Sequence, residues 1–340
     1  MVIITYKIKN LSAIILALFM FFAFLFNSEL VAKTSVESMS VCFFKLIPSI
    51  FPYMVLSGFL MKVCLTNKRN KSNLDKCKTS RIIVLLSWLS GYIVGPKNLC
   101  ESSQNKDITD LIFLTSNAGV GFVISYVGAM LWGSILFGIF LFLSQILCGY
   151  FLYIFSKNKA TIQCNKAKNK PILTSLSDAI QDSVKTVLSI CGFSVFFSVV
   201  KSIILHFFKE GFVTLIVASS LEISSGAFAS VSFENVSICA FFTGFTVGFG
   251  GFCMCMQTFT VCHNDQLNKG NFLCLKLIQG LMCGILSLLF VNYFHIEPIK
   301  QTFSSLNGNF GVFSVIIGAI FIFFSLYTAK KLLKNKLYSI

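Results

Sequence analysis

The sequence predicts an all-α protein that crosses a membrane several times, and three observations lead to this fold class. Hydrophobic residues make up 55% of the 340 residues, and charged residues make up 12%. That charged share is about half of what an ordinary soluble domain carries. The mean hydropathy is +0.80. The apolar residues form long runs that short polar loops separate, as in a polytopic helical bundle.

Eight apolar runs are long enough to span a bilayer, which requires about 20 residues per helix. They cover residues 11–33, 41–63, 109–130, 131–156, 183–208, 235–262, 271–294 and 309–329. The first run follows Lys7 and Lys9 in the manner of a signal peptide. No clean small-x-small cleavage site follows it, so the sequence favours a retained first helix.

Two further apolar segments, 82–97 and 212–230, are short and interrupted by small or polar residues. Gly91, Gly95 and Pro96 break the first of them. Lysines and arginines cluster in residues 68–81, 157–170 and 330–336, and such clusters are expected on the cytoplasmic side. All three clusters reach that side only if both short segments enter and leave the membrane on the same side. We therefore expect two re-entrant segments and cytoplasmic termini.

The expected elements occur twice in the same order. The predicted organisation is an N-terminal helix (1–35), a first repeat unit (36–156), a basic cytoplasmic linker (157–182), a second repeat unit (183–294), and a C-terminal helix with a basic tail (295–340). Val120-Gly121-Phe122 recurs as Val247-Gly248-Phe249 at the matching place. The first unit begins outside and the second inside, so the repeat is inverted. Inverted repeats with interrupted segments in corresponding places are typical of alternating-access transporters.

Polar groups at the interruptions are the candidates for a binding site. Non-helical backbone at membrane depth occurs where it is buried in protein or lines a wet cavity. A turn at Gly91 and Gly95 exposes backbone dipoles, with Lys97 near its mouth, and an anionic solute can use both. Alternatively, Lys97 only extends to the cytoplasmic surface. The sequence leaves both interpretations open.

Glu222 lies within the second short segment, with apolar residues on both sides. A carboxylate at the bilayer centre costs about 2.5–3.5 kcal/mol on insertion scales, so such an acid usually faces a cavity or a partner. It therefore either couples transport to an ion or pairs with a lysine such as Lys201 or Lys45. The amides of Asn117 and Gln257 either bind a polar solute or bridge helices.

Other motifs are absent or weak. The sequence contains no GxxxxGK[ST], GxSxG or HExxH motif, so we expect neither a self-contained ATP-driven pump nor an enzyme. Thirteen cysteines without a CxxC pair are interpreted as packing residues, and three distant histidines indicate no metal site. We expect no cofactor. The net charge of +15 comes from loops and the tail, so nucleic acid is not an expected partner.

Four segments carry a family resemblance. Residues 91–97 are similar to G-F/Y-P-x-G-A-K, 117–122 to an Asn and Gly-Pro segment, 221–226 to L-E-I-S/T-x-G, and 248–251 with Gln257 to G-F-G-G followed by a glutamine. In this order they resemble the sporulation integral membrane protein YlbJ family, within the nucleoside-recognition (Gate) domain group. Ile93 and Val120 stand where that family has proline, and Pro96 where it has alanine. The chain is therefore identified as a divergent member.

The resemblance implies a multi-pass protein of the outer forespore membrane that acts in endospore formation. The family is associated with moving dipicolinic acid, a small planar dianion. On this basis we expect a small anionic metabolite and the lipid bilayer as partners, together with a second copy of the chain or other sporulation membrane proteins. The alternatives are a carrier of nucleosides or another small metabolite, and a membrane scaffold for spore assembly that transports nothing.

The resemblance and the residue patterns together name a site. The expected substrate-binding residues are Gly91, Gly95, Lys97, Asn117, Gly119 and Gln257, and the expected coupling or ion-pairing residue is Glu222. No catalytic residue is expected.

Overall fold

The computed structural model of the protein describes residues 2–66, 83–102, 107–155, 171–207, 211–262 and 265–299. The predicted helix 309–329 and the three basic clusters (68–81, 157–170 and 330–336) lie outside these residues. Within the described residues every regular element is helical, which confirms the predicted all-α class.

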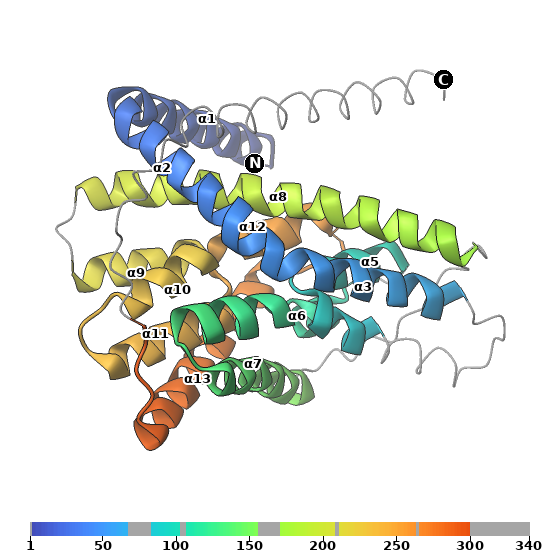
Figure 1. Cartoon of the computed structure of the whole chain (residues 1–340). Coiled ribbons are helices and arrows are strands. Elements are labelled where there is room, and N and C mark those ends of the chain that lie inside the picture. Colours follow the sequence, from blue (N-terminus) through green and yellow to red (C-terminus); the bar gives the residue numbers. More distant parts are fainter. Residues whose placement is uncertain are drawn as a thin grey trace. The chain divides into compact units, whose positions relative to one another are not determined.

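The elements fall on both sides of residues 156–170 (Figure 1). Before them come α1 (Val2–Phe26), α2 (Ser28–Val41), the π-helical η1 (Cys42–Leu46), α3 (Ile47–Thr66), a helix over residues 83–90, α5 (Val94–Ser102), α6 (Thr109–Thr115), the π-helical η2 (Gly121–Leu131) and α7 (Ile135–Phe155). After them come α8 (Ile172–His206), α9 (Phe212–Leu221), α10 (Ile223–Val231), α11 (Val236–Phe249), α12 (Gly251–Val261) and α13 (Lys269–Phe294).

Several helices have the length and surface of membrane spans. Among the described residues, five stretches are long and apolar enough to cross: Ser28–Val63, Ile135–Phe155, Ile172–His206, Val236–Val261 and Lys269–Phe294. Shorter apolar helices cover Leu11–Phe26, Gly121–Leu131 and Phe212–Leu221. Large apolar side chains are freely exposed on them, for example Phe19 and Leu147, whereas soluble proteins avoid wide exposed apolar surfaces. The chain is a polytopic α-helical membrane protein.

The first two predicted spans are less separate than the sequence indicates. Residues 34–40 were expected between helices, but α2, η1 and α3 continue one another from residue 28 to residue 66. The polar side chains of this stretch pack on α8, where Thr34 Oγ1 donates to Ser202 Oγ (3.1 Å) and Ser38 Oγ to Ser198 Oγ (3.2 Å). Because tertiary contacts satisfy these hydroxyls, the polar stretch stays helical.

The second unit also begins earlier than predicted, because α8 starts at Ile172, inside the predicted linker 157–182. A salt bridge of 2.7 Å between Lys62 on α3 and Asp182 on α8 joins these helices near that end. In Figure 1, α8 lies alongside α2 and α3.

Both predicted re-entrant segments are helical hairpins. In hairpin 1 (residues 83–102), α5 folds back so closely that a methyl group on Gly95 would lie 2.6 Å from Ser87 Cβ. In hairpin 2 (Phe212–Val231), a methyl group on Gly226 would lie 2.8 Å from Ser219 Cα. Each arm has 8 to 10 residues, or about 12–15 Å at 1.5 Å per residue, which is half of a hydrocarbon core of about 30 Å. The hairpins therefore enter and return without crossing.

Two predicted spans are broken in the middle. The expected helix 109–130 is interrupted at residues 116–119, between α6 and η2, and we call this pair broken helix 1. The expected helix 235–262 is interrupted at Gly250, between α11 and α12, and we call this pair broken helix 2. Gly250 and Gly251 have φ values of +83° and +77°, which an α-helix does not allow.

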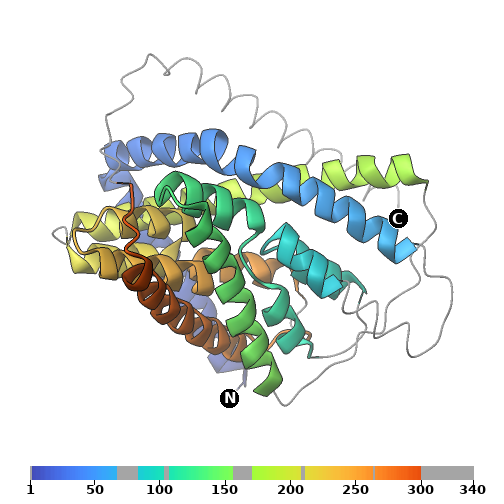
Figure 2. The ribbon, with the colours of Figure 1, turned by 60° about the horizontal axis from the view of Figure 1, so that its bottom comes forward.

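The order of elements is thus the same in both units: a long helix, a hairpin, a broken helix and a second long helix (Figures 1 and 2). By length and composition, the long helices of both units and broken helix 2 are candidate membrane spans, whereas broken helix 1 contributes the shorter apolar helix Gly121–Leu131. The inverted orientation of the second unit stays a prediction.

Candidate functional site

The tips of both hairpins contact the break of the helix that follows. At the tip of hairpin 1, a methyl group on Gly91 would lie 3.1 Å from the backbone nitrogen of Gly119, in the break of broken helix 1. At broken helix 2, a methyl group on Gly251 would lie 3.0 Å from the Leu221 carbonyl oxygen and from the Glu222 nitrogen, at the tip of hairpin 2. The same contact of backbone on backbone therefore occurs once in each unit.

Tyr92 joins the two units at this point. Its hydroxyl donates a hydrogen bond of 3.0 Å to the carbonyl oxygen of Val247, near the end of α11. The last carbonyls of a helix have no partner within it, so Tyr92 from hairpin 1 satisfies an acceptor that the break in broken helix 2 leaves open. All four interruptions therefore meet in the interior.

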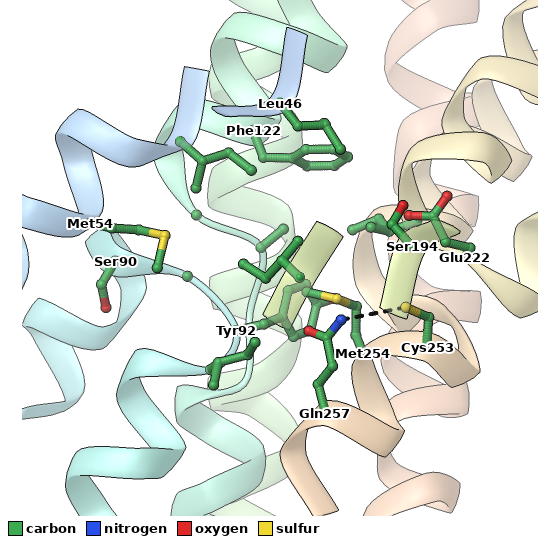
Figure 3. Close-up of a pocket in the computed structure, with 17 residues that line it drawn as sticks. Leu46, Met54, Ser90, Tyr92, Phe122, Ser194, Glu222, Cys253, Met254 and Gln257 are labelled. Atoms are coloured by element: carbon green, nitrogen blue, oxygen red, sulfur yellow. Dashed lines mark hydrogen bonds between the residues drawn. The ribbon is translucent and has the colours of Figure 1, made fainter. Parts of the chain in front are cut away.

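A buried cavity lies where the interruptions meet (Figure 3). Most of its wall is apolar, and its polar wall groups are the side chains of Ser90, Tyr92, Ser194, Glu222, Cys253 and Gln257 with the backbone at residues 91 and 118–119. In Figure 3, Glu222 and Ser194 lie on one side and Ser90 and Met54 on the other, with Tyr92 and Gln257 between them. Both units contribute to the wall.

The cavity is small in this conformation. The space open to the centres of water molecules is about 40 Å³. One water needs about 10–15 Å³ by this measure, so about three fit, whereas pockets for metabolites usually reach about 300 Å³ or more. In this conformation the cavity is therefore too small to hold a metabolite.

Four helices have their N-terminal ends at the cavity. Ile93 precedes α5, Gly119 precedes η2, Glu222 caps α10, and Cys253 lies in the first turn of α12; all four line the cavity. A helix N-terminus carries about half a positive charge and free N–H donors. Of the four preceding helices, only the C-terminal residue Ser90 lines the wall. Helix N-termini therefore outnumber helix C-termini among the elements that line the cavity, and the carboxylate of Glu222 occupies one of these N-termini.

Glu222 occupies one of these N-termini itself. It is 2% exposed, and its backbone is extended (φ −148°, ψ 134°) between α9 and α10. Its carboxylate accepts hydrogen bonds from the backbone N–H groups of Ser224 (3.0 Å) and Ser225 (2.6 Å) and from the Ser224 hydroxyl (2.6 Å). Glu222 is thus the N-cap of α10, and its carboxylate is bound by the free N–H groups of that helix.

The alternative role of Glu222 was an ion pair with Lys201 or Lys45. Among the described residues, the ion pair within 4 Å is that of Lys62 and Asp182, and neither Lys201 nor Lys45 bridges Glu222. The hydrogen bonds of this carboxylate come from the N-terminus of α10, and Lys201 on α8 interacts with it electrostatically from beyond 4 Å. Pairing with a lysine therefore stays a prediction.

Gln257, on α12, is 1% exposed and has an unsatisfied amide oxygen in the cavity wall. Its amide nitrogen makes a long contact of 3.5 Å with Cys253 Sγ. Rotating the amide by half a turn exchanges the oxygen for two N–H donors at the same position. Gln257 is therefore able to offer either an acceptor or a donor to a solute.

Asn117 does not line the cavity, because it belongs to a network that holds the break of broken helix 1. Its side-chain oxygen accepts from Gln279 Nε2 (2.9 Å), and its side-chain nitrogen donates to the Leu114 carbonyl (3.0 Å). Gln145, from α7, bonds both the N–H (3.1 Å) and the carbonyl (2.8 Å) of Ala118. The backbone groups freed by the break are thus paired inside the protein, as membrane depth requires.

Lys276, on α13, is the functional group that the sequence analysis missed. It is 0% exposed, and its ammonium donates to the Ser116 carbonyl (2.7 Å) and to Gln279 Oε1 (2.8 Å). The ammonium also lies 5.1 Å from the centre of the Tyr92 ring, a cation–π distance. It therefore places a positive charge directly behind a wall residue of the cavity. The sequence signal for this group is Gln279, because two polar residues three positions apart share one face of an otherwise apolar helix.

Four of the seven predicted site residues line the cavity: Gly91, Gly119, Gln257 and Glu222. The other three do not. Gly95 packs against Ser87 inside hairpin 1, Lys97 is half-buried on α5, and Asn117 lies in the network. The prediction that Lys97 meets the cargo stays a prediction.

These features define a multi-pass α-helical membrane protein with two hairpins and two broken helices around a buried central site. Part of the chain is similar to the sporulation integral membrane protein YlbJ of Bacillus subtilis (strain 168), with 26% identity over 166 residues. This match covers 42% of the chain and 40% of that protein, which supports a distant relationship. No family model matches the chain, and no solved structure matches it.

Proposed function

We propose that this protein is a sporulation transporter that moves a small organic anion, dipicolinic acid, across the outer forespore membrane by alternating access. The observation that carries the proposal is the convergence of four helix N-termini on a buried cavity that two hairpin tips close. The sporulation context comes from the name of the Bacillus relative, and the cargo from the family resemblance.

The predicted inverted repeat supplies a mechanism. Hairpin 1 and hairpin 2 enter from opposite sides of the membrane, so moving one tip opens the cavity to one side while the other tip keeps it closed. Each tip is held to its broken helix by a backbone contact at glycine, Gly91 with Gly119 and Gly251 with Leu221. Since the closed cavity holds only a few waters, binding and release of cargo both require such a movement.

A dicarboxylate has suitable partners in the wall. Residues at the starts of α5, η2 and α12 line the cavity and are expected to offer their N–H donors to it, whereas the N–H donors of α10 are already bound to Glu222. Lys276 adds a positive charge behind Tyr92, and Gln257 adds an amide. We assign Glu222 to coupling, because protonating it releases the N-terminus of α10 for a second carboxylate.

A second candidate, a neutral solute such as a nucleoside, is favoured by different wall groups. Glu222 and the unsatisfied oxygen of Gln257 are both acceptors, and Tyr92 and Phe122 place aromatic rings in the wall. A nucleoside offers hydroxyl and amino donors to the acceptors and a flat base to the rings.

Uptake of labelled dipicolinate into proteoliposomes that contain the purified protein tests the proposal. We expect uptake above protein-free vesicles that excess unlabelled dipicolinate suppresses and uridine does not. Uptake of labelled uridine alone contradicts the anion proposal in favour of the second candidate. Uptake of neither solute contradicts transport of both and favours a scaffold. In sporulating cells, deletion of the gene is expected to lower spore dipicolinate, and complementation to restore it.

A further inference from the structure

Three pairs of buried cysteines join the two units. The Cys42 side chain interacts with Cys191, Cys148 with Cys283, and Cys100 with Cys262. In every pair the first cysteine belongs to the first unit and the second to the second unit. Sequence spacing gave no sign of this pairing, because the members of the last pair are 162 positions apart.

The two sulfur atoms of Cys100 and Cys262 lie 2.9 Å apart. Cys100 lies near the C-terminal end of α5 in hairpin 1, and Cys262 directly follows α12. Both side chains are buried, at 5% and 9% exposure. A disulfide has a sulfur–sulfur distance of about 2.05 Å, so the two atoms need to approach by less than about 1 Å.

Hydrogen bonds near this cysteine pair already join the two units. The backbone N–H groups of Asp107 and Ile108 donate to the carbonyls of Asp265 and Gln266, both at 2.9 Å. The Gln266 side chain donates to the Cys100 carbonyl (3.3 Å). The two cysteines are therefore held in place by neighbours whose hydrogen bonds do not depend on the thiols.

Position along the helices distinguishes this pair from the other two. Cys100 and Cys262 lie at helix ends, next to the polar sequence segments 101–107 and 263–266. Cys148 and Cys283 lie within the apolar helices α7 and α13, and Cys191 lies in the apolar part of α8. A water-soluble oxidant reaches helix ends at the membrane surface more readily than the hydrocarbon layer.

We propose that Cys100 and Cys262 are a site of reversible disulfide formation that fixes hairpin 1 to the second unit. The co-reactant is a low-molecular-weight disulfide. One cysteine thiolate attacks it and releases the first small thiol, and the second cysteine thiolate then attacks the mixed disulfide and releases the second. Two cysteine thiols lose two protons and two electrons, one sulfur–sulfur bond forms, and the small disulfide is reduced to two thiols.

The cross-link has a mechanical consequence, which rests on the proposed transport function. α5 is one arm of hairpin 1, and its start forms the tip that closes the cavity over Gly119. A covalent bond between the C-terminal end of α5 and broken helix 2 restrains the movement of hairpin 1 that opens the cavity. Oxidation then stops transport, and reduction restores it.

A cross-linking experiment on the full chain tests the site without any transport assay. A protease site is inserted in the segment 157–170, membranes are treated with oxidised glutathione, free thiols are blocked, and the chain is cut. We expect the two halves to stay joined on a non-reducing gel, to separate after reduction, and to yield a Cys100–Cys262 disulfide peptide by mass spectrometry. Cys100→Ser and Cys262→Ser are expected to abolish the joining, whereas Cys274→Ser, at an exposed position on α13, is expected to leave it unchanged.

Two results overturn the site: halves of the oxidised wild-type protein that separate, or halves that stay joined in Cys100→Ser. If a serine variant does not accumulate, the peptide map of the wild-type protein decides alone. The functional arm compares uptake before and after oxidation. Uptake that is equal in the cross-linked and reduced protein overturns the restraint on hairpin 1, and absent uptake in the reduced protein counts against the proposed function while the gel still decides the site.

Discussion

Replacing Glu222 by glutamine tests the electrostatics of the site most directly. The carboxylate accepts from the N–H groups of Ser224 and Ser225. Glutamine has one oxygen and turns its NH₂ group toward the other N–H, so one buried donor loses its acceptor at about 1–3 kcal/mol. Loss of the negative charge at the helix N-terminus adds about 0.3–2 kcal/mol. Together, we expect Glu222→Gln to lower the free energy of unfolding by about 1–5 kcal/mol.

The assay is thermal unfolding of the detergent-purified protein, with membrane abundance measured alongside. Asn268→Ala is the matched control, because Asn268 caps α13 with a neutral side chain that accepts from the N–H of Asn271 (3.2 Å) at an exposed position. Losing such a cap costs about 1 kcal/mol. The difference between the two variants isolates the buried charge.

Two outcomes would refute this reasoning about Glu222. An unchanged melting temperature contradicts an ionised carboxylate bound at the N-terminus of α10. A protein that fails to accumulate indicates a stranded cation and so a lysine partner, which the described residues do not place within 4 Å of Glu222. On the proposed transport function, the same variant is also expected to lose coupled dipicolinate uptake.

Further substitutions test the contacts around the cavity. Gly251→Ala places a methyl group against backbone at a positive φ, and we expect it to lower the free energy of unfolding by about 2–5 kcal/mol. The control Gly192→Ala, in a helix with open space around it, is expected to raise the free energy of unfolding by about 0.5–1 kcal/mol. Equal effects on thermal unfolding contradict the close contact at Gly251. Tyr92→Phe leaves the Val247 carbonyl unpaired and should lower stability by about 1–3 kcal/mol, and no change would remove this link between the units. Lys276→Met leaves two buried acceptors unpaired, partly offset by removal of a buried charge, and should lower stability by about 1–4 kcal/mol. On the proposed transport function it should also weaken dipicolinate uptake, and unchanged uptake excludes a role in anion attraction.

The location of the hairpins was predictable, whereas the breaks in the spanning helices were not. Segments 82–97 and 212–230 are too short to cross, and basic loops decide their side, so composition suffices. Segment 235–262 is long and apolar throughout, and glycine in such a run also serves close helix packing, so Gly250 carries no distinct signal of a break. The left-handed backbone there depends on the contact with hairpin 2, which is tertiary.

The site was predictable where a polar or glycine residue interrupts an apolar segment, as at Glu222 and Gly91. Lys276 was missed because it lies five residues after the expected start of the helix 271–294, where a lysine ordinarily extends to the interface. Asn117 was expected in the wall, but its side chain bonds the amide of Gln279, while the Gln145 amide holds the backbone of the neighbouring Ala118. Which of several amides faces a cavity is decided by the packing of distant helices.

The glycine contacts at the hairpin tips also limit how the chain can be altered there. Backbone lies against backbone at Gly91 with Gly119 and at Gly251 with Leu221, so these contacts order no side-chain rotamer. On the proposed transport function these two contacts are the gates. One methyl group on Gly119 then holds the first gate apart and one on Gly251 the second, and the two variants are expected to leak toward opposite sides of the membrane.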